Sequence, residues 1–327
     1  MGETGRNSAS EGDAMNELAV TDRSAVLDAI GHTPIVRVSN LVEPGMAEVW
    51  VKLESHNPTG SYKDRMALAM VEGAERRGDI RPGDTLVEYT GGSTGSSLAF
   101  VCSVKGYRLR IVSSDAFAEE KIRTMRAFGA DVELIPSPEG IHPDLIPSMM
   151  RRAKEIVAES GGYATDQFSN TDMLDGYASL GTEIADQLDD RVDAFVGYVG
   201  TAGCFLGATR ALRQRVPSVR RIAVEPAESA VLGGGRPGTH RIEGGGAGFW
   251  PPQLSPDDID EIETVSTDEA MAMARRAARE EGLWSGPSTG ANLVAALRVA
   301  RRLGEGRRVV TVLVDSGLKY LGGSLYA

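Results

Sequence analysis

Lys63 is the side chain whose type and setting could do chemistry most directly. It follows the turn-forming segment 57–61, and we expect Ser61 to be the N-cap of the helix that starts there. Because the positive end of a helix dipole disfavours an ammonium group, we expect the pKa of Lys63 to be lowered. A partly neutral lysine amine can attack a carbonyl group and form a Schiff base. For the lysine alone, however, a surface residue followed by an Asp–Arg pair is the better interpretation.

Three further segments combine glycines with hydroxyl side chains, and each joins an expected strand to an expected helix. They are T-G-G-S-T-G-S-S at 90–97, G-Y-V-G-T-A-G-C at 197–204 and G-P-S-T-G-A-N at 286–292. Backbone N–H groups and hydroxyls at a helix N-terminus form a site for a carboxylate or a phosphate. Ordinary strand-to-helix turns have a similar composition, and Ser288 could equally be a plain N-cap. Each segment alone is therefore ambiguous.

One of these segments also matches an unrelated class of enzyme. Residues 91–95 fit G-x-S-x-G, the nucleophile turn of α/β-hydrolases, with Ser93 as the nucleophile. A hydrolase triad needs an acid and then a histidine downstream of the serine. Only His142 and His240 follow Ser93. The hydrolase hypothesis leaves Lys63 without a role, so we keep it as the weaker alternative.

The elements that must position these segments alternate between strands and helices. Apolar and β-branched runs predict strands at 35–38, 49–53, 85–89, 109–112, 132–135, 195–199, 222–224 and 309–314. Helical spacing of apolar residues predicts helices at 66–75, 119–128, 149–159, 205–212 and 268–281, with others opening near Ser96 and after residue 286. We therefore expect an α/β fold of two domains, each with a mostly parallel twisted sheet flanked by helices.

Composition and charge narrow the class of protein further. The 327 residues carry a net charge of −11 without a long basic run, which argues against a nucleic-acid partner. The two cysteines, Cys102 and Cys204, predict a reducing cytoplasm rather than a disulfide framework. No apolar run approaches the roughly 20 residues that span a bilayer, so no membrane partner is expected. The scattered histidines predict no metal site, and residues 1–20 are expected to be a disordered tail.

Taken together and in this order, the segments resemble the cysteine synthase and cystathionine β-synthase family of fold-type-II pyridoxal-phosphate enzymes. The matches are N-P-T-G-S-Y-K-D-R (57–65), T-G-G-S-T-G (90–95), D-Q-F-S-N (166–170), G-T-A-G-C (200–204), V-E-P with G-T-H-R-I and G-G-G-A-G-F (224–249), G-P-S-T-G-A-N (286–292) and V-D-S-G with Y-L (314–321). The resemblance implies a tryptophan synthase β-like fold, bound pyridoxal 5'-phosphate and a homodimer. It also implies a smaller, mobile substrate domain at 51–158 and a larger cofactor domain at 21–50 plus 159–327.

The resemblance also assigns roles to individual residues. Lys63 matches the lysine that joins the cofactor and moves the α-proton of the substrate. The substrate-binding residues would be Thr90, Gly91, Gly92, Ser93, Thr94, Gln167 and Gly246. The cofactor-binding residues would be Lys63 and Ser93, the phosphate loop of Gly200, Thr201, Ala202, Gly203 and Cys204, and Ser288 at the pyridine nitrogen.

The implied reaction is β-replacement on an O-activated serine such as O-acetylserine, through an aminoacrylate, giving cysteine or another β-substituted alanine. Because a serine hydroxyl does not hold the pyridine nitrogen protonated, prompt loss of a β leaving group is favoured. A serine or threonine dehydratase, a cystathionine-β-synthase-like enzyme and a catalytically silent scaffold stay as alternatives. The family usually has T-S-G-N-T-G at 90–95 and a threonine at Cys204, so Gly91 and Ser93 predict a pocket for a bulkier donor or nucleophile.

Overall fold

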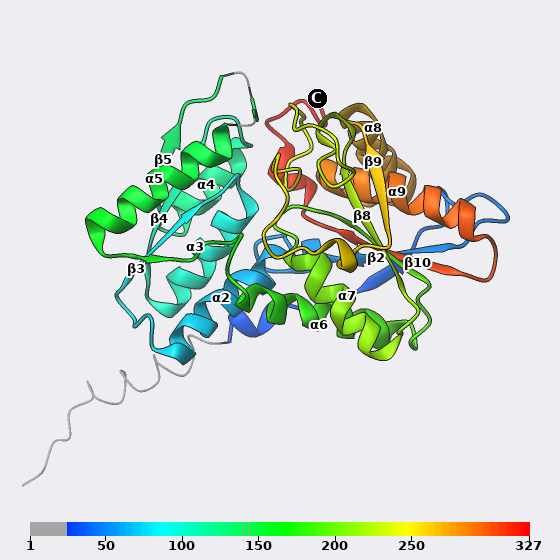
Figure 1. Ribbon diagram of the computed structural model, residues 1–327, viewed down its shortest axis with the longest axis horizontal. Coiled ribbons are helices and arrows are strands. Elements are labelled where there is room, and N and C mark those ends of the chain that lie inside the picture. The colour runs from blue at the N-terminus through cyan, green and yellow to red at the C-terminus, as the bar shows by residue number, and fades with distance from the viewer. Residues whose placement is uncertain (1–24, 139, 143) are drawn as a thin grey trace, which may run out of the picture.

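Two sheets organise the part of the chain that the computed structural model describes, which is residues 25–138, 140–142 and 144–327 (Figure 1). The predicted tail at residues 1–20 lies outside these ranges. The larger sheet has the strand order β1 (Ile35–Arg37), β2 (Glu48–Leu53), β10 (Arg308–Leu313), β7 (Ala194–Tyr198), β8 (Arg220–Pro226) and β9 (Glu261–Val265). The smaller sheet has the order β5 (Asp131–Ile135), β4 (Arg108–Ser114), β3 (Thr85–Tyr89) and β6 (Tyr163–Ala164). Neighbouring strands are parallel except β1 and β2.

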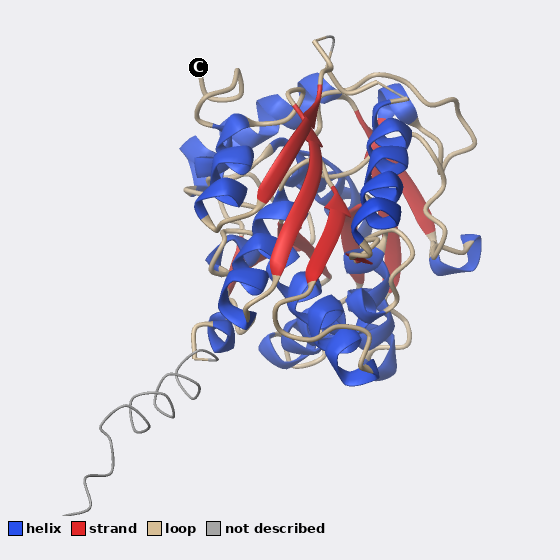
Figure 2. Cartoon of the chain, turned by 90° about the vertical axis from the view of Figure 1, so that its left-hand side faces the viewer, coloured by secondary structure: helices blue, strands red, loops and turns tan. Residues whose placement is uncertain are grey.

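Helices flank both sheets, and Figure 2 shows them on either side of the strands. Their bounds are α2 (Lys63–Arg77), α3 (Ser93–Lys105), α4 (Glu119–Ala127), α5 (Leu145–Ser160), α6 (Asp172–Gln187), α7 (Gly203–Arg215), α8 (Thr267–Arg276) and α9 (Pro287–Leu303). None of the helices in the described ranges combines the length and the apolar composition that crossing a membrane requires.

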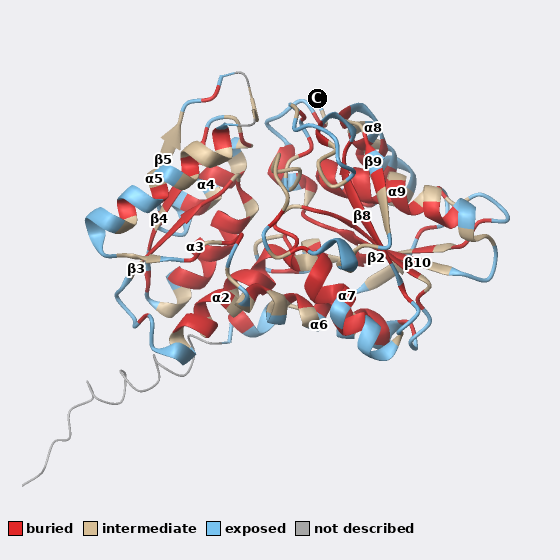
Figure 3. Ribbon diagram, viewed as in Figure 1, coloured by how far each residue is buried: buried red, intermediate tan, exposed pale blue. Residues whose placement is uncertain are grey.

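The inner strands of the smaller sheet, β3 and β4, bury their two faces against different helices, because successive side chains of a strand point to opposite sides. Leu86 of β3 belongs to the same core cluster as Leu98 of α3. The next residue, Val87, packs in a separate cluster with Met149 of α5. In the larger sheet, the α9 and α7 sides are separated in the same way. Figure 3 shows the inner strands β3 and β4 buried over most of their length, whereas the edge strand β5 is intermediate.

The predicted α/β architecture with mostly parallel sheets is confirmed, whereas two strands and one α-helix were not predicted. The strands β6 and β9 were missed because one is two residues long and the other, E-I-E-T-V, alternates charged and apolar residues. Helix α6 was missed because Gly176 and Gly181 interrupt its helix-forming pattern. A Cβ at Gly181 would overlap the backbone of Ala208, so this glycine allows α6 to approach α7 closely.

Several helix starts differ from the predictions, and α5, for example, begins at Leu145 rather than at residue 149. Helix α3 begins at Ser93 rather than near Ser96. Ser61 is not the N-cap of α2, because its backbone pairs with Asp315 in an extended bridge and the helix therefore begins at Lys63 with Tyr62 as N-cap. The predicted domain borders and the mobility of residues 51–158 stay predictions. Sheet membership places β2 with the larger sheet and β6 with the smaller one.

Candidate active site

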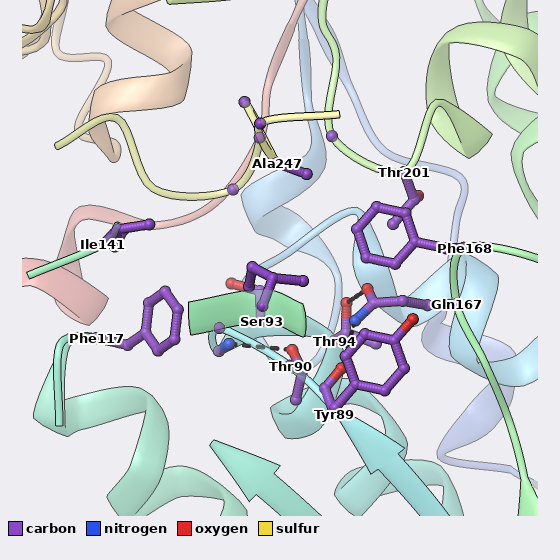
Figure 4. A pocket seen from close by; sticks show the side chains of 18 of the residues that line it. Tyr89, Thr90, Ser93, Thr94, Phe117, Ile141, Gln167, Phe168, Thr201 and Ala247 are labelled. Atoms are coloured by element: carbon purple, nitrogen blue, oxygen red, sulfur yellow. Dashed lines mark hydrogen bonds between the residues drawn. The ribbon is translucent and has the colours of Figure 1, made fainter. Parts of the chain in front are cut away.

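A cavity lies where loops from the two sheets meet, and it gathers most of the predicted site residues (Figure 4). The loops after β3 and β7 reach it from the carboxyl ends of their strands, the usual position of ligands in such sheets. The predicted residues that line it are Lys63, Thr90, Gly91, Gly92, Ser93, Thr94, Gln167, Gly200, Thr201 and Gly246. The predicted residues Ala202, Gly203, Cys204 and Ser288 are not among the lining residues. Residues that were not predicted also line it, among them Phe117, Lys121, Ile141, His142, Phe168 and His240.

Lys63 is the first residue of α2, and its side chain is almost wholly buried against the cavity. Burial lowers its pKa to about 8, while the negative charge of Asp315 acts in the opposite direction. The direction agrees with the prediction, but burial rather than the helix dipole is the main cause. At neutral pH a larger fraction of this amine is therefore neutral than in an exposed lysine.

A buried ion network fixes α2 just beyond Lys63. Arg65 Nε lies 2.7 Å from Glu54 Oε2, and Arg65 Nη1 lies 2.7 Å from Glu183 Oε1. Lys52 Nζ completes the network at 2.6 Å from Glu183 Oε2. The network joins β2, α2 and α6, so removing one partner would leave an uncompensated buried charge. The helix backbone at Lys63 is therefore held against the larger sheet.

The loop between β3 and α3 is shaped by hydrogen bonds within it. Gly92 N donates to Thr90 Oγ1 at 3.1 Å, and Thr94 Oγ1 donates to Gln167 Oε1 at 2.7 Å, as Figure 4 shows. Gly92 has a φ of 147°, and a Cβ there would overlap the side chain of Lys121. The first N–H groups of α3 have no partner inside the helix, which makes this turn suited to a carboxylate.

Gly91 does not leave the extra room that the sequence suggested. An added Cβ at this position would stand 2.6 Å from Cε1 of Phe117, so the phenyl ring takes the space. Phe117 follows β4, and Figure 4 shows its ring in the cavity beside Ser93 and Thr90. Any enlargement of the pocket must therefore come from Ser93, which is shorter than asparagine.

Gln167 is held by a buried carboxyl group that was not predicted. Its amide Nε2 donates to Tyr89 O at 2.8 Å, and its backbone N–H donates to Glu88 Oε2 at 3.1 Å. Glu88 also accepts a hydrogen bond from Thr165 Oγ1 at 2.7 Å. Burial raises the pKa of Glu88 to about 8, against the lowering effect of these hydrogen bonds. The side chain of Gln167 is thus oriented by the smaller sheet before any ligand binds.

The loop between β7 and α7 fits a phosphate group. A Cβ at Gly200 would stand 2.5 Å from Gly244 O, and one at Gly203 would stand 2.5 Å from Met173 Sδ. Ala202, the N-cap of α7, has a φ of 69°, an unusual conformation for a non-glycine residue. These constraints present a helix N-terminus to the cavity. Burial raises the pKa of Cys204, so its thiol stays protonated and is a weak donor.

Ser288 supplies the sharpest test of whether the site fits the expected cofactor. It is the second residue of α9, whose N-cap is Gly286 without a side-chain hydrogen bond, so Ser288 is not a capping residue. Its Oγ is buried and has no hydrogen-bond partner among the described residues. A ring nitrogen of pyridoxal phosphate would satisfy this hydroxyl. The amine of Lys63, the loop before α7 and Ser288 together fit that cofactor.

The chain is similar to known proteins over most of its length. Residues 26–315 match the family described as Pyridoxal-phosphate dependent enzyme. The chain belongs to this family. It is 42% identical over 304 residues to a cysteine synthase of Staphylococcus aureus (strain N315), covering 92% of this chain and 96% of the relative. The family membership confirms the predicted cofactor, pyridoxal phosphate.

Solved structures of this family superpose closely on the chain. An O-ureido-L-serine synthase matches with a TM-score of 0.87 and 36% identity, over 92% of this chain and 94% of that one. An O-acetylserine dependent cystathionine β-synthase from Helicobacter pylori matches with a TM-score of 0.87 and 37% identity, over 92% of this chain and 98% of that one. The predicted fold-type-II architecture is thereby confirmed.

The hydrolase alternative finds no support in this geometry. Ser93 does lie on a strand-to-helix turn, but its Oγ donates to Asp315 Oδ2 at 3.0 Å instead of contacting a histidine. His240 is engaged elsewhere, since Nε2 contacts Gly246 O at 2.9 Å and Nδ1 accepts from Ile242 N at 3.2 Å. Within the described ranges, no three His, Cys, Asp or Glu side chains gather as they would around a metal ion.

Proposed function

We propose that the chain catalyses β-replacement on an O-activated serine such as O-acetylserine, giving cysteine or another β-substituted alanine. The observation that carries this proposal is the buried amine of Lys63, which faces a cavity between a carboxylate loop and a phosphate loop. The similarity to a cysteine synthase and to an O-ureido-L-serine synthase supports the same reaction type.

The proposed role of each site residue follows from the chemistry of its side chain or backbone. Bound pyridoxal phosphate supplies an electron-withdrawing ring that makes the α-proton of an attached amino acid acidic. Lys63 would hold the cofactor through its side-chain nitrogen and then take the α-proton. The five residues Thr90, Gly91, Gly92, Ser93 and Thr94, with Gln167 and Gly246, would fix the substrate and align its Cα–H bond.

The remaining predicted residues would hold the cofactor in place. The loop of Gly200, Thr201, Ala202, Gly203 and Cys204 would bind the phosphate through N–H groups, and Ser288 would bind the pyridine nitrogen. We also propose a homodimer that works in the cytoplasm, because the family resemblance implies the first and both cysteines are free.

The visible absorption spectrum of the purified protein tests this function. We expect a yellow protein whose absorption band shifts when O-acetylserine is added, with release of acetate. Addition of a thiol should then restore the band and yield a β-substituted alanine.

Other outcomes separate the alternatives. Release of pyruvate instead of a thiol adduct would favour the dehydratase. A yellow protein that neither shifts nor releases acetate with any O-activated serine would favour a silent scaffold. A colourless protein that takes up no added pyridoxal phosphate would overturn the proposal.

A further inference from the structure

Ser93 makes a hydrogen bond that no motif in the sequence predicts. Its hydroxyl lines the cavity, yet it donates to the carboxylate of Asp315, which follows β10 of the larger sheet. Asp315 is 2% exposed, and its other oxygen, Oδ1, has no partner among the described residues. A cavity-lining hydroxyl is thus coupled to a buried carboxylate with spare acceptor capacity.

The direction of every hydrogen bond around Asp315 follows from which groups can donate. The ammonium of Lys121 can only donate, and it does so to Tyr320 OH at 3.1 Å. Tyr320 OH must therefore pass its own proton onward, to Asp315 Oδ2 at 2.9 Å. Burial raises the pKa of Tyr320 well above its usual value, so the phenol stays protonated. Asp315 consequently accepts from Tyr320 and from Ser93.

This arrangement fixes how Ser93 meets a ligand. A hydroxyl has one proton and two lone pairs, and Ser93 already gives its proton to Asp315. Toward the cavity, Ser93 Oγ can therefore only accept a hydrogen bond. A group that carries a proton, such as an N–H, O–H or S–H, is the partner that satisfies it.

We propose that Ser93 and Asp315 form a proton relay that deprotonates the incoming nucleophile, an inference that rests on the proposed β-replacement. As the nucleophile X–H attacks the β-carbon, the X–C bond forms and the X–H bond breaks. The proton of X–H moves to Ser93 Oγ, and the proton of Ser93 moves to Asp315 Oδ2. Lys63 returns a proton to Cα, where the displaced electron pair arrives, and Asp315 releases its proton to solvent.

The charges that surround Asp315 suit this step. Lys63 and Lys319 both interact with its negative charge, and Lys121 is linked to it through Tyr320. Lys121 is itself paired with Glu243 at 2.7 Å. The carboxylate is thus held in place on several sides while Oδ1 stays free of hydrogen bonds within the described chain.

The relay is specific to the serine at this position. The family usually has asparagine there, and a carboxamide neither gives up nor accepts a proton at neutral pH. With asparagine, the side chain at this position cannot take the proton of the nucleophile. With Ser93 and Asp315, the site can use weakly acidic nucleophiles that carry their proton at neutral pH, such as azoles, alcohols or protonated thiols.

The test compares two nucleophiles against the same donor, O-acetylserine, in the pyridoxal-phosphate-loaded enzyme. Azide has no proton to lose, whereas pyrazole carries an N–H proton at neutral pH. For Ser93→Ala and Asp315→Asn, we expect the ratio of the azide rate to the pyrazole rate to rise by about 10²-fold or more, the usual size of general-base catalysis. Product formation is measured by mass spectrometry.

A matched control lies on the same helix. Ser103 Oγ donates to Phe100 O at 2.8 Å, and Ser103→Ala should keep the wild-type ratio. Equal losses with both nucleophiles in Ser93→Ala would show a structural role and overturn the relay, even if Asp315→Asn did not fold. If wild-type protein releases no acetate from O-acetylserine, the proposed function itself fails, so the two failures are distinguishable.

Discussion

The two sides of the cavity differ in how far their polar groups are satisfied by the protein itself. On the smaller-sheet side, Thr94, Gln167 and Glu88 hydrogen-bond with one another and with the backbone of the strand. On the larger-sheet side, Ser288 Oγ is buried without a partner among the described residues, and Thr201 Oγ1 reaches only the sulfur of Met173, at 3.8 Å.

The difference indicates which side of the cavity already has its final shape before a ligand binds. A buried hydroxyl without a partner destabilises the folded protein by about 1–3 kcal/mol. Bound cofactor would remove that penalty on the larger-sheet side. The smaller-sheet side needs no such completion, so it should keep its shape in the apoprotein.

Lys63 stands between the two sides, and its removal should have the largest effect. We expect Lys63→Ala to lower the rate of β-replacement by at least about 10³-fold, because no other group takes the α-proton. Lys105 pairs with Glu75 outside the cavity, so Lys105→Ala should keep the wild-type rate. Turnover of Lys63→Ala within tenfold of wild type would contradict the role of this lysine. The assay is product formation from O-acetylserine and a thiol.

The pH dependence of cofactor uptake tests the lowered pKa of Lys63. Only the neutral amine reacts, and Lys63 has a pKa of about 8 in the folded protein. Between pH 6 and 8 the rate of uptake by the apoprotein should rise about tenfold per pH unit and then level off. Stopped-flow absorbance measures this rate. With N-acetyl-lysine as the control amine, the rise should continue to about pH 10; a protein profile identical to that control would contradict the prediction.

Breaking the smaller-sheet side should affect folding rather than cofactor affinity. Gln167→Leu would leave Tyr89 O and Thr94 Oγ1 without their present partners. We expect the free energy of unfolding of the apoprotein to fall by about 1–3 kcal/mol, measured by urea denaturation. Gln214 is exposed on α7, so Gln214→Leu should change this energy little. An unchanged stability in Gln167→Leu would remove the contrast between the two sides.

A substitution on the larger-sheet side should weaken cofactor binding without destabilising the apoprotein. Ser288→Ala should weaken pyridoxal-phosphate binding by about tenfold, while the stability of the apoprotein stays equal or rises, because an unsatisfied hydroxyl is removed. Ser229 is a useful control, since its Oγ is also buried without a partner in the described chain, but it lies in the turn after β8 and was not predicted to contact the cofactor. Ser229→Ala should leave the affinity for cofactor unchanged in a titration followed by absorbance. Equal affinities for wild type and Ser288→Ala would contradict the assignment.

Local sequence patterns were enough to predict most of the strands and the turns that carry the site. Apolar runs bounded by turns predicted eight of the strands, among them β3, where prediction and structure share the bounds Thr85–Tyr89. The glycine-rich turns and Lys63 were found because each lies within one continuous segment, where spacing and residue type carry the signal. The family match covers residues 26–315 and so includes those segments.

Only the tertiary structure decided which distant residues meet. Ser93 and Asp315 are 222 positions apart, and no periodicity relates a turn of the smaller sheet to the end of a strand in the larger one. The tertiary structure also places Phe117 in the space at Gly91. It buries Lys63 as well, and this burial is the main cause of the lowered pKa of Lys63. The sequence determines which groups each segment offers. Packing of the two sheets determines which of them are buried together, and burial is what changes their chemistry.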